Sequence, residues 1–115
     1  MSHVQLVNDD SFKSEVLNAT QPVLVDCFAQ WCGPCRMLAP VLDQLAAEFE
    51  GRAKIVKIDV DESPALAQKL SIQAMPTLIL FDEGQEVDRT VGAPPAAALR
   101  QMLSSRINVP PTVST

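Results

Sequence analysis

Hydrophobic and polar residues follow two patterns along this chain, and these predict strands that alternate with helices. Three short runs are rich in apolar residues: Pro22–Ala29, Ala53–Val60 and Thr77–Phe81. Such runs are typical of strands buried on both faces of a sheet. His3–Val7 is predicted as an additional first strand. The turn Asp82–Gln85 predicts a hairpin whose second strand covers Glu86–Val91.

Apolar residues at spacings of three and four predict four helices in the remaining segments. Asp9 or Asp10 is the expected N-cap of the first helix. Gly51 ends the second helix, and Ser63-Pro64 supplies the cap and first position of the third. The apolar positions are Phe12, Val16 and Leu17 in the first helix, Leu38, Val41, Leu42, Leu45 and Phe49 in the second, Leu66 and Leu70 in the third, and Leu99, Met102, Leu103 and Ile107 in the fourth.

The order of these elements predicts an α/β fold with a mixed sheet covered by helices. The strand–helix–strand unit over residues 22–60 requires parallel pairing, whereas the late hairpin requires antiparallel pairing. One domain is expected over residues 1–107. Asn108–Thr115, which contains Pro110-Pro111, is expected to form a flexible C-terminal tail.

Composition narrows the possible functions. The chain has 115 residues and a formal net charge of −5, with no cluster of Lys and Arg, which argues against binding nucleic acid or an anionic membrane. We see no signal peptide and no apolar run long enough to span a bilayer. Three cysteines are too few for a secreted disulfide scaffold. A reducing, cytoplasmic compartment is therefore expected.

The strongest chemical signal is Trp31-Cys32-Gly33-Pro34-Cys35, which lies where an apolar run gives way to a helical pattern. Unpaired N–H groups at a helix start stabilise a thiolate, the attacking species in thiol–disulfide exchange. Cys32 is therefore the expected nucleophile, and Cys35, one turn deeper and less exposed, the resolving thiol. Gly33 leaves room for a substrate backbone, and Pro34 has a fixed φ that suits a first helical turn.

Two other interpretations of the cysteine pair compete with a redox function. Two cysteines at this spacing form half of many zinc sites, but no second pair appears and His3 is remote in sequence. No metal is therefore expected. The cysteines could also be unrelated core residues. A reversible redox pair is favoured over both alternatives.

The string Val25–Pro40, together with Met75-Pro76-Thr77 and Val91-Gly92-Ala93, resembles the thioredoxin family over about residues 4–107. The resemblance implies a central five-stranded mixed sheet flanked by four helices. It implies a monomeric protein-disulfide reductase that works by dithiol–disulfide exchange and binds no cofactor. Its electrons would come from NADPH through a flavoprotein thioredoxin reductase, and its substrates would be proteins that contain disulfides.

Asp26 interrupts a buried strand six residues before Cys32. Burial without a partner raises the pKa of a carboxyl group, so Asp26 could accept the proton of Cys35. The resemblance implies that role for Asp26 and a matching position for Lys57. The alternatives are a purely structural pair between Asp26 and Lys57, and a Lys57 that extends into solvent.

The resemblance also implies a cis bond before Pro76, which leaves the preceding backbone free to pair with an extended substrate. An apolar substrate-docking rim would surround Cys32. Its expected members are Trp31, Ala74, Met75, Gly92 and Ala93. The alternative for Trp31 is an ordinary core aromatic.

The chain departs from the usual family pattern at Cys27-Phe28, where many members have Phe-Trp. Cys27 and its neighbour Asp26 should point to opposite faces of the strand, so Cys27 is expected to be a buried, inert thiol outside the redox pair. A different class of function also fits the sequence. The same rim could belong to a binding module or subunit that binds its partner in only one redox state of the cysteine pair.

Overall fold

The computed structural model describes residues 3–107, which form five strands and four helical segments. Their order is β1 (Gln5–Leu6), η1 (Lys13–Leu17), β2 (Val23–Phe28), α1 (Gly33–Glu48), β3 (Lys54–Asp59), α2 (Pro64–Lys69), β4 (Thr77–Asp82), β5 (Gln85–Val91) and α3 (Ala96–Ile107). The predicted strands and helices are therefore confirmed in number and order. The predicted tail, 108–115, lies outside the described residues.

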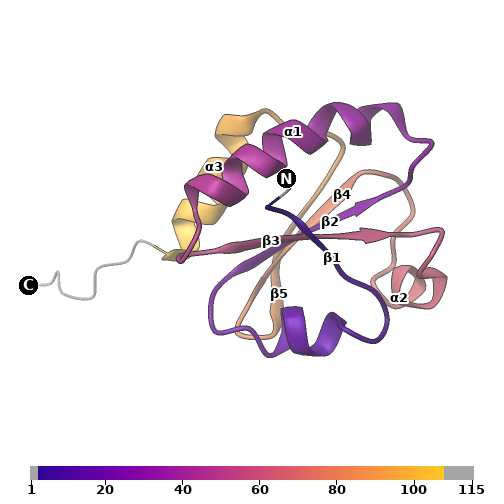
Figure 1. The fold of residues 1–115 in the computed structure, drawn as a ribbon, viewed down its shortest axis with the longest axis horizontal. Helices are drawn as coiled ribbons and strands as arrows, with labels where there is room; N and C mark the ends of the chain where they lie inside the picture. Colours follow the sequence, from indigo (N-terminus) through magenta and orange to yellow (C-terminus); the bar gives the residue numbers. More distant parts are fainter. Residues whose placement is uncertain (1–2, 108–115) are drawn as a thin grey trace, which may run out of the picture.

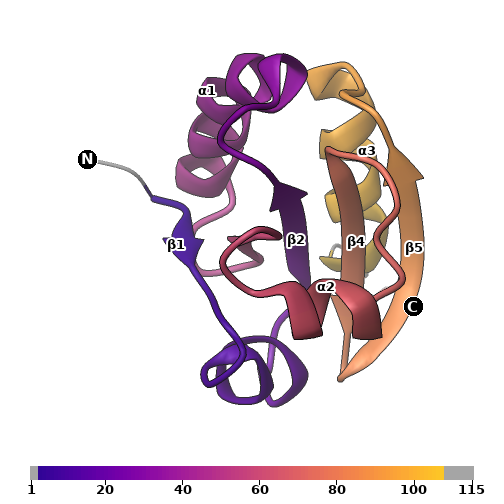
Figure 2. The same ribbon diagram turned by 90° about the vertical axis from the view of Figure 1, so that its right-hand side faces the viewer.

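The five strands form one mixed sheet in the order β1-β3-β2-β4-β5, with β1 and β5 at its two margins (Figure 2). β3 pairs in parallel with both β1 and β2, and the chain crosses over through α1 between β2 and β3. β4 pairs antiparallel with β2 and with β5. The predicted combination of parallel and antiparallel pairing is confirmed.

Helices cover both faces of the sheet (Figure 1). α1 and α3 lie on one face, where leucines of both helices, such as Leu42 and Leu103, pack against Leu24 and Ile55 of the strands. η1 and α2 lie on the other face, where Val16 and Leu66 belong to a second apolar cluster. β2 lies between these two layers, which explains why nearly every residue of its sequence is apolar.

The N-terminal region differs from the prediction. β1 covers only two residues instead of His3–Val7. The residue that organises the start of η1 is Asn8, not Asp9 or Asp10: the Asn8 side chain accepts hydrogen bonds from the backbone N–H groups of Asp10 and Ser11. The asparagine turns the backbone in this way five residues ahead of η1, which begins at Lys13.

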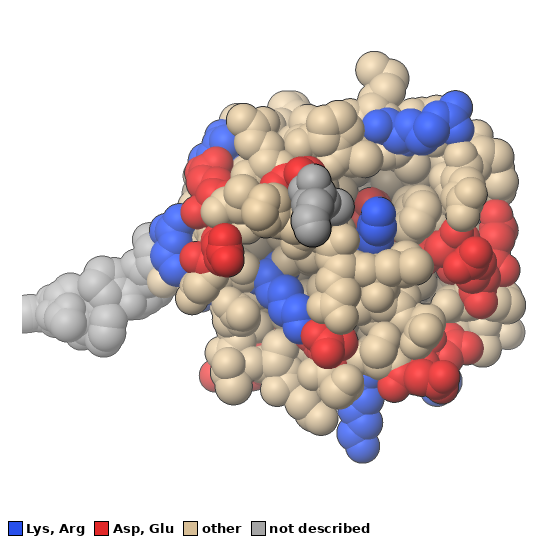
Figure 3. Space-filling view, viewed as in Figure 1, with Lys and Arg blue, Asp and Glu red and all other residues tan. Residues whose placement is uncertain are grey.

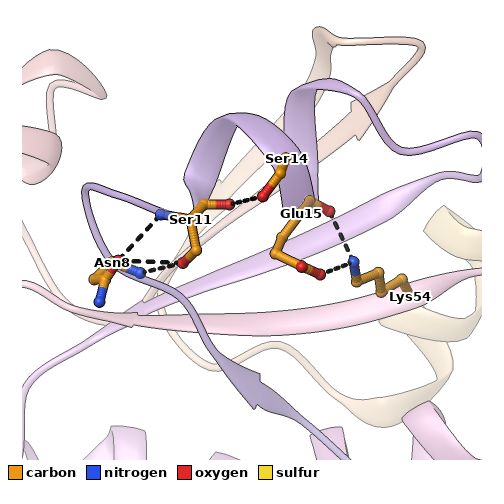
Figure 4. Close-up of polar contacts among 5 residues, drawn as sticks. All are labelled: Asn8, Ser11, Ser14, Glu15 and Lys54. Atoms are coloured by element: carbon orange, nitrogen blue, oxygen red, sulfur yellow. Dashed lines mark hydrogen bonds and ion pairs between the residues drawn. The ribbon is translucent and has the colours of Figure 1, made fainter.

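Side-chain contacts then fasten η1 to the sheet (Figure 4). Lys54 of β3 donates to the backbone carbonyl of Glu15 at 2.9 Å and forms an ion pair with its carboxylate at 2.5 Å. The segment is short, and the N–H of Asn18 donates to the carbonyl of Lys13, five residues back. Its wider helical turn could not be inferred from the apolar spacing.

The β4–β5 hairpin closes through Glu83 and Gly84, whose φ angles are 53° and 78°. Positive φ at both central residues is the geometry of the tight hairpin turn that matches the twist of a sheet. The turn confirms the hairpin prediction, although β5 begins one residue earlier than expected, at Gln85.

Acidic side chains gather at the end of the molecule where β3 terminates, as Figure 3 shows in the orientation of Figure 1. Lys and Arg side chains on the same face lie in separate places and form no continuous basic area there. Among residues 3–107, no helix is both long enough and apolar enough to cross a bilayer.

Candidate active site

Cys32 and Cys35 form a disulfide at the start of α1, with their Cα atoms 5.3 Å apart. The chain leaves β2 at Phe28 and turns through a hydrogen bond from the N–H of Cys32 to the carbonyl of Ala29 (3.1 Å). Cys32 is the N-cap of α1, and Pro34 occupies its first turn, as the sequence predicts. The N–H of Cys35 donates to Sγ of Cys32 at 3.2 Å. The helix start therefore directs a backbone donor at the sulfur expected to carry negative charge.

Both cysteines are 4% exposed. The expectation that Cys35 is less exposed than Cys32 is therefore wrong for this disulfide form. The bond draws the two sulfurs together, and both residues pack with Ala29 and Met75 in one small apolar cluster.

Asp26 lies behind this pair, on β2. It is 4% exposed, and its Oδ1 has no hydrogen-bond partner among the residues that the structure describes. Burial raises the pKa of Asp26 from an ordinary value of 3.8 to about 7, while the charge of Lys57 works against that rise. The carboxyl group is thus placed to exchange a proton near neutral pH.

An open cavity of about 280 Å³ connects Asp26 with Cys35. Its lining residues are Asp26, Phe28, Ala29, Gln30, Cys35, Arg36, Ala39 and Lys57. Asp26, Lys57 and Cys35, which were selected from the sequence, therefore share one cavity, with room for a water molecule to reach the carboxyl group.

Lys57 is the neighbour of Asp26 across the parallel β2–β3 pair. None of the ion pairs within residues 3–107 joins the two side chains. Nζ of Lys57 lies 5.7 Å from the ring centroid of Phe28. Lys57 therefore acts on Asp26 through its charge at a distance, and the structure offers no support for a close structural ion pair.

The loop before β4 brings a second segment to the disulfide. The Met75–Pro76 bond is cis, and Met75 packs beside the two cysteines. The N–H of Gly92 donates to the carbonyl of Pro76 at 2.8 Å, which joins the end of β5 to this loop. Gly92 has a φ of 98°, a conformation that glycine adopts readily and other residues avoid.

The residues expected to form the docking rim lie at the surface around this loop. Ala74 and Ala93 are exposed, Met75 and Gly92 are half-buried and Pro76 is buried. A Cβ atom at Gly33 would meet no atom within 4 Å, so the backbone there is open to an approaching chain. Met75 makes none of the turn and loop backbone hydrogen bonds within residues 3–107.

Trp31 is 66% exposed, so its interpretation as a core aromatic is wrong. Its indole Nε1–H donates to the Asp61 carboxylate at 2.9 Å. Sequence reasoning missed Asp61, and it left two exposed apolar residues out of the expected rim, Met37 of α1 and Val91 at the end of β5. Val91 could have been found from its position next to Gly92.

Cys27 faces the opposite layer of the sheet, in the cluster that contains Val16 and Leu66. It is a free, fully buried thiol, as expected, and it has no part in the disulfide. Burial, with a smaller contribution from the charge of Asp26, raises the pKa of Cys27 to about 12. Among the described residues, no three His, Cys, Asp or Glu side chains gather in a group that could hold a metal ion.

A mixed sheet with helices on both faces and a Cys-Gly-Pro-Cys disulfide at a helix start defines a thiol–disulfide oxidoreductase. The family model described as Thioredoxin matches residues 3–105. The chain is 49% identical to Thioredoxin 1 of Nostoc sp. over 107 residues, which are 93% of this chain and 100% of that protein.

It is also 48% identical to the thioredoxin of Synechocystis sp., over 90% of this chain and 96% of that protein. Its identity to the thioredoxin of Staphylococcus aureus is 48%, over 88% and 95% of the two chains. The chain belongs to the thioredoxin family. It reduces disulfides by dithiol–disulfide exchange through Cys32 and Cys35.

Proposed function

We propose that the chain is a cytoplasmic dithiol electron carrier in which Cys32 attacks the target and Cys35 releases it. The Cys32 thiolate attacks one sulfur of a target disulfide, forms a mixed disulfide and expels the other target sulfur as a thiolate. The Cys35 thiolate then attacks Sγ of Cys32. This closes the Cys32–Cys35 disulfide and releases the second target thiol, so that two electrons pass from the protein to its target.

The observation that carries this proposal is the position of Cys32 as the N-cap of α1, where the N–H of Cys35 donates to its sulfur at 3.2 Å. A donor and a helix dipole directed at Sγ stabilise the thiolate of Cys32 before it attacks the target disulfide. Cys35 lies within the first turn of α1 and its sulfur can reach that of Cys32 without moving the helix.

Asp26 is proposed to accept the proton of Cys35 during the second step. Its carboxyl group borders the same cavity as Cys35, and a pKa of about 7 lets it take up or release a proton under neutral conditions. Lys57 is proposed to tune this exchange, because its charge lowers the pKa that burial has raised. The remaining cavity space would let water carry the proton between the two groups.

Targets are proposed to dock on the rim around Cys32 as an extended chain. The Met75 backbone is not used by the turns and loops of the described protein, so it can pair with a substrate backbone. Trp31, Gly33, Pro34, Ala74, Pro76, Gly92 and Ala93 would form the surrounding surface. Recognition through backbone pairing would allow many different protein substrates.

Re-reduction is proposed to come from a flavoprotein thioredoxin reductase that draws its electrons from NADPH. The chain is proposed to act as a monomer without a bound cofactor. Two observations support this proposal. The chain belongs to the thioredoxin family, and the Cys32–Cys35 disulfide needs only an external two-electron donor to begin another cycle.

An insulin-reduction assay with dithiothreitol tests the proposal. The wild-type chain should accelerate insulin reduction, Cys32→Ser should abolish the acceleration, and Cys27→Ser should retain it as a matched control. Cys35→Ser should accumulate mixed disulfides with target proteins, because the release step is removed. A wild type that reduces insulin no faster than dithiothreitol alone would contradict the carrier role and favour a redox-gated binding module.

A further inference from the structure

Asp59 and Asp61, at the end of β3 and in the loop before α2, form hydrogen bonds with Gln30 and Trp31, the two residues that precede Cys32. Asp59, the last residue of β3, is 3% exposed. Its carboxylate accepts a hydrogen bond from the side-chain amide of Gln30 at 3.2 Å. It also accepts the backbone N–H groups of Asp61 at 2.9 Å and of Glu62 at 3.3 Å. One buried carboxylate therefore fixes both the shape of the loop and its distance from Gln30.

Asp61, which Asp59 holds in place, reaches the next residue along the chain. Its carboxylate accepts the indole N–H of Trp31 at 2.9 Å. The Trp31 ring is mostly exposed, so little packing restrains it. The hydrogen bond to Asp61 is therefore the main restraint on the direction in which the indole points.

A third contact holds the same segment from the side of α1. A guanidinium N–H of Arg36 donates to the backbone carbonyl of Gln30 at 2.7 Å. Gln30 is thus tied by its backbone to α1 and by its side chain to β3, and Trp31 follows directly. The backbone of this segment is fixed, and only the indole depends on Asp61.

We propose that Asp61, oriented by Asp59, is a positioning residue that holds the Trp31 indole beside Cys32 as a preformed wall for docking targets. The proposal rests on the proposed function, in which Trp31 belongs to the docking rim. A ring already held in its binding orientation loses less freedom when a target docks, so target affinity rises without any new contact.

Trp31 is the only tryptophan of the chain, so its fluorescence reports on the indole directly. In the reduced protein, Asp61→Ala should lower the fluorescence anisotropy and raise the acrylamide quenching constant, because the ring gains rotational freedom. Asp61→Asn keeps an acceptor oxygen but removes the charge, and it should behave as the wild type. Glu62→Ala, which removes a charge from the same loop without touching Trp31, is the matched control.

Steady-state insulin reduction then tests the link to docking. Asp61→Ala should raise KM about two- to tenfold and leave kcat little changed, as expected for the loss of one hydrogen bond that orders the binding surface. Asp61→Asn should restore the wild-type KM. Asp59→Ala should reproduce the fluorescence change of Asp61→Ala, because the loop loses the group that orients it.

Unchanged fluorescence in Asp61→Ala would overturn the positioning role. Altered fluorescence with an unchanged KM would also overturn the proposal, because the orientation of the indole would then have no effect on target docking. Either result would leave the carrier function standing if the Cys32→Ser variant is inactive and the wild type active. If the wild type itself fails to reduce insulin, the proposed function fails. The fluorescence of Asp61→Ala then still tests whether Asp61 holds the Trp31 indole.

Discussion

Burial raises the pKa values of two adjacent residues, Asp26 and Cys27, but only Asp26 lies where it can exchange a proton with the active site. Burial raises the pKa of Asp26 to about 7 and that of Cys27 to about 12. Asp26 borders a cavity that also reaches Cys35, so its proton can exchange. Cys27 lies in the closed apolar layer under η1 and α2, so its thiol stays protonated and inert.

Replacing Asp26 by Ala should stabilise the protein at neutral pH. The native state binds the Asp26 proton more tightly than the unfolded chain does, so this group costs stability as pH rises from about 4 to about 7. The full cost is about 4 kcal/mol, against which the cavity left by alanine costs roughly 1–3 kcal/mol. Asp26→Ala should therefore be about 1–3 kcal/mol more stable than wild type at pH 8, measured by urea denaturation.

The same comparison at pH 4 should give no gain in stability for Asp26→Ala, since the carboxyl group is then protonated in the native state and only about half ionised in the unfolded chain, so that its cost falls to about 0.5 kcal/mol, less than that of the cavity. Asp10→Ala, which removes an exposed carboxylate before η1, is the control for the loss of a charge. Insulin reduction by Asp26→Ala should be about tenfold slower or more, because the proton acceptor is lost. Equal or lower stability at pH 8 would contradict the assignment of a destabilising buried charge.

Cys27 should not react with iodoacetamide in the native, reduced protein at pH 8, since its thiolate fraction there is about one in ten thousand. Cys32 should react within the same period, and mass spectrometry of peptides distinguishes the two sites. Unfolding in guanidinium should make Cys27 reactive, which serves as the positive control. Rapid labelling of native Cys27 would show that its layer of the sheet opens readily.

At the scale of elements, the turn of the β4–β5 hairpin lies close against the end of η1. Gly84 has a φ of 78°, and a Cβ atom placed there would lie 2.9 Å from the backbone carbonyl oxygen of Leu17, at the end of η1. Backbone atoms cannot move aside as a flexible side chain can. The turn therefore needs glycine both for its conformation and for its fit against η1.

Gly84→Ala should lower the free energy of unfolding by roughly 2–4 kcal/mol, as measured in urea. Gly51→Ala is the matched control, because Gly51 has a similar φ of 87° but no atom within 4 Å of its Cβ position. It should cost only about 1 kcal/mol, which is the cost of the backbone conformation alone. Equal losses in the two variants would show that the hairpin does not press on η1.

Most elements could be predicted from the sequence because their apolar patterns are long. β2 and β4 coincide with nearly continuous apolar runs, β3 carries Ile55, Val56 and Ile58 between its charged residues, and α1 follows its leucine spacing to within a few residues. β1 and η1 are short, so their sequences carry little pattern, and their limits are set by pairing with β3 and by the contact between Lys54 and Glu15.

Some residues of the site could also be predicted from the sequence, whereas others could not. The Cys32–Cys35 pair is encoded within four residues, and Asp26 stands out as one acid in an apolar strand. The contacts of Asp59 with Gln30 and of Asp61 with Trp31 join residues about thirty positions apart. No local pattern indicates such pairs, because they form only once β2 and β3 lie side by side.

At the scale of the whole molecule, two apolar layers share one sheet and should unfold together. β3 contributes a buried isoleucine to each layer: Ile55 packs with α1 and α3, and Ile58 packs on the face of η1 and α2. Any loss in one layer weakens the strand on which the other layer is built. The two layers are therefore parts of one cooperative unit.

Ile55→Val and Ile58→Val should each cost about 1 kcal/mol, and the double variant should cost their sum to within about 0.5 kcal/mol. Urea denaturation of all three variants, followed by circular dichroism and by Trp31 fluorescence, should give coincident single transitions. Separate transitions for the two probes would show that the protein does not unfold as one cooperative unit.

The alternation of side chains along β2 has one more consequence, for insertions and deletions. A slip of β2 by one residue would turn Cys27 toward Cys35 and bury Asp26 in the layer beneath η1. A third thiol would then lie near the exchanging sulfurs and offer the protein a wrong internal partner. Because neighbouring strands fix β2 on both sides, we expect single-residue length changes in Val23–Phe28 to cause disulfide scrambling as well as loss of stability.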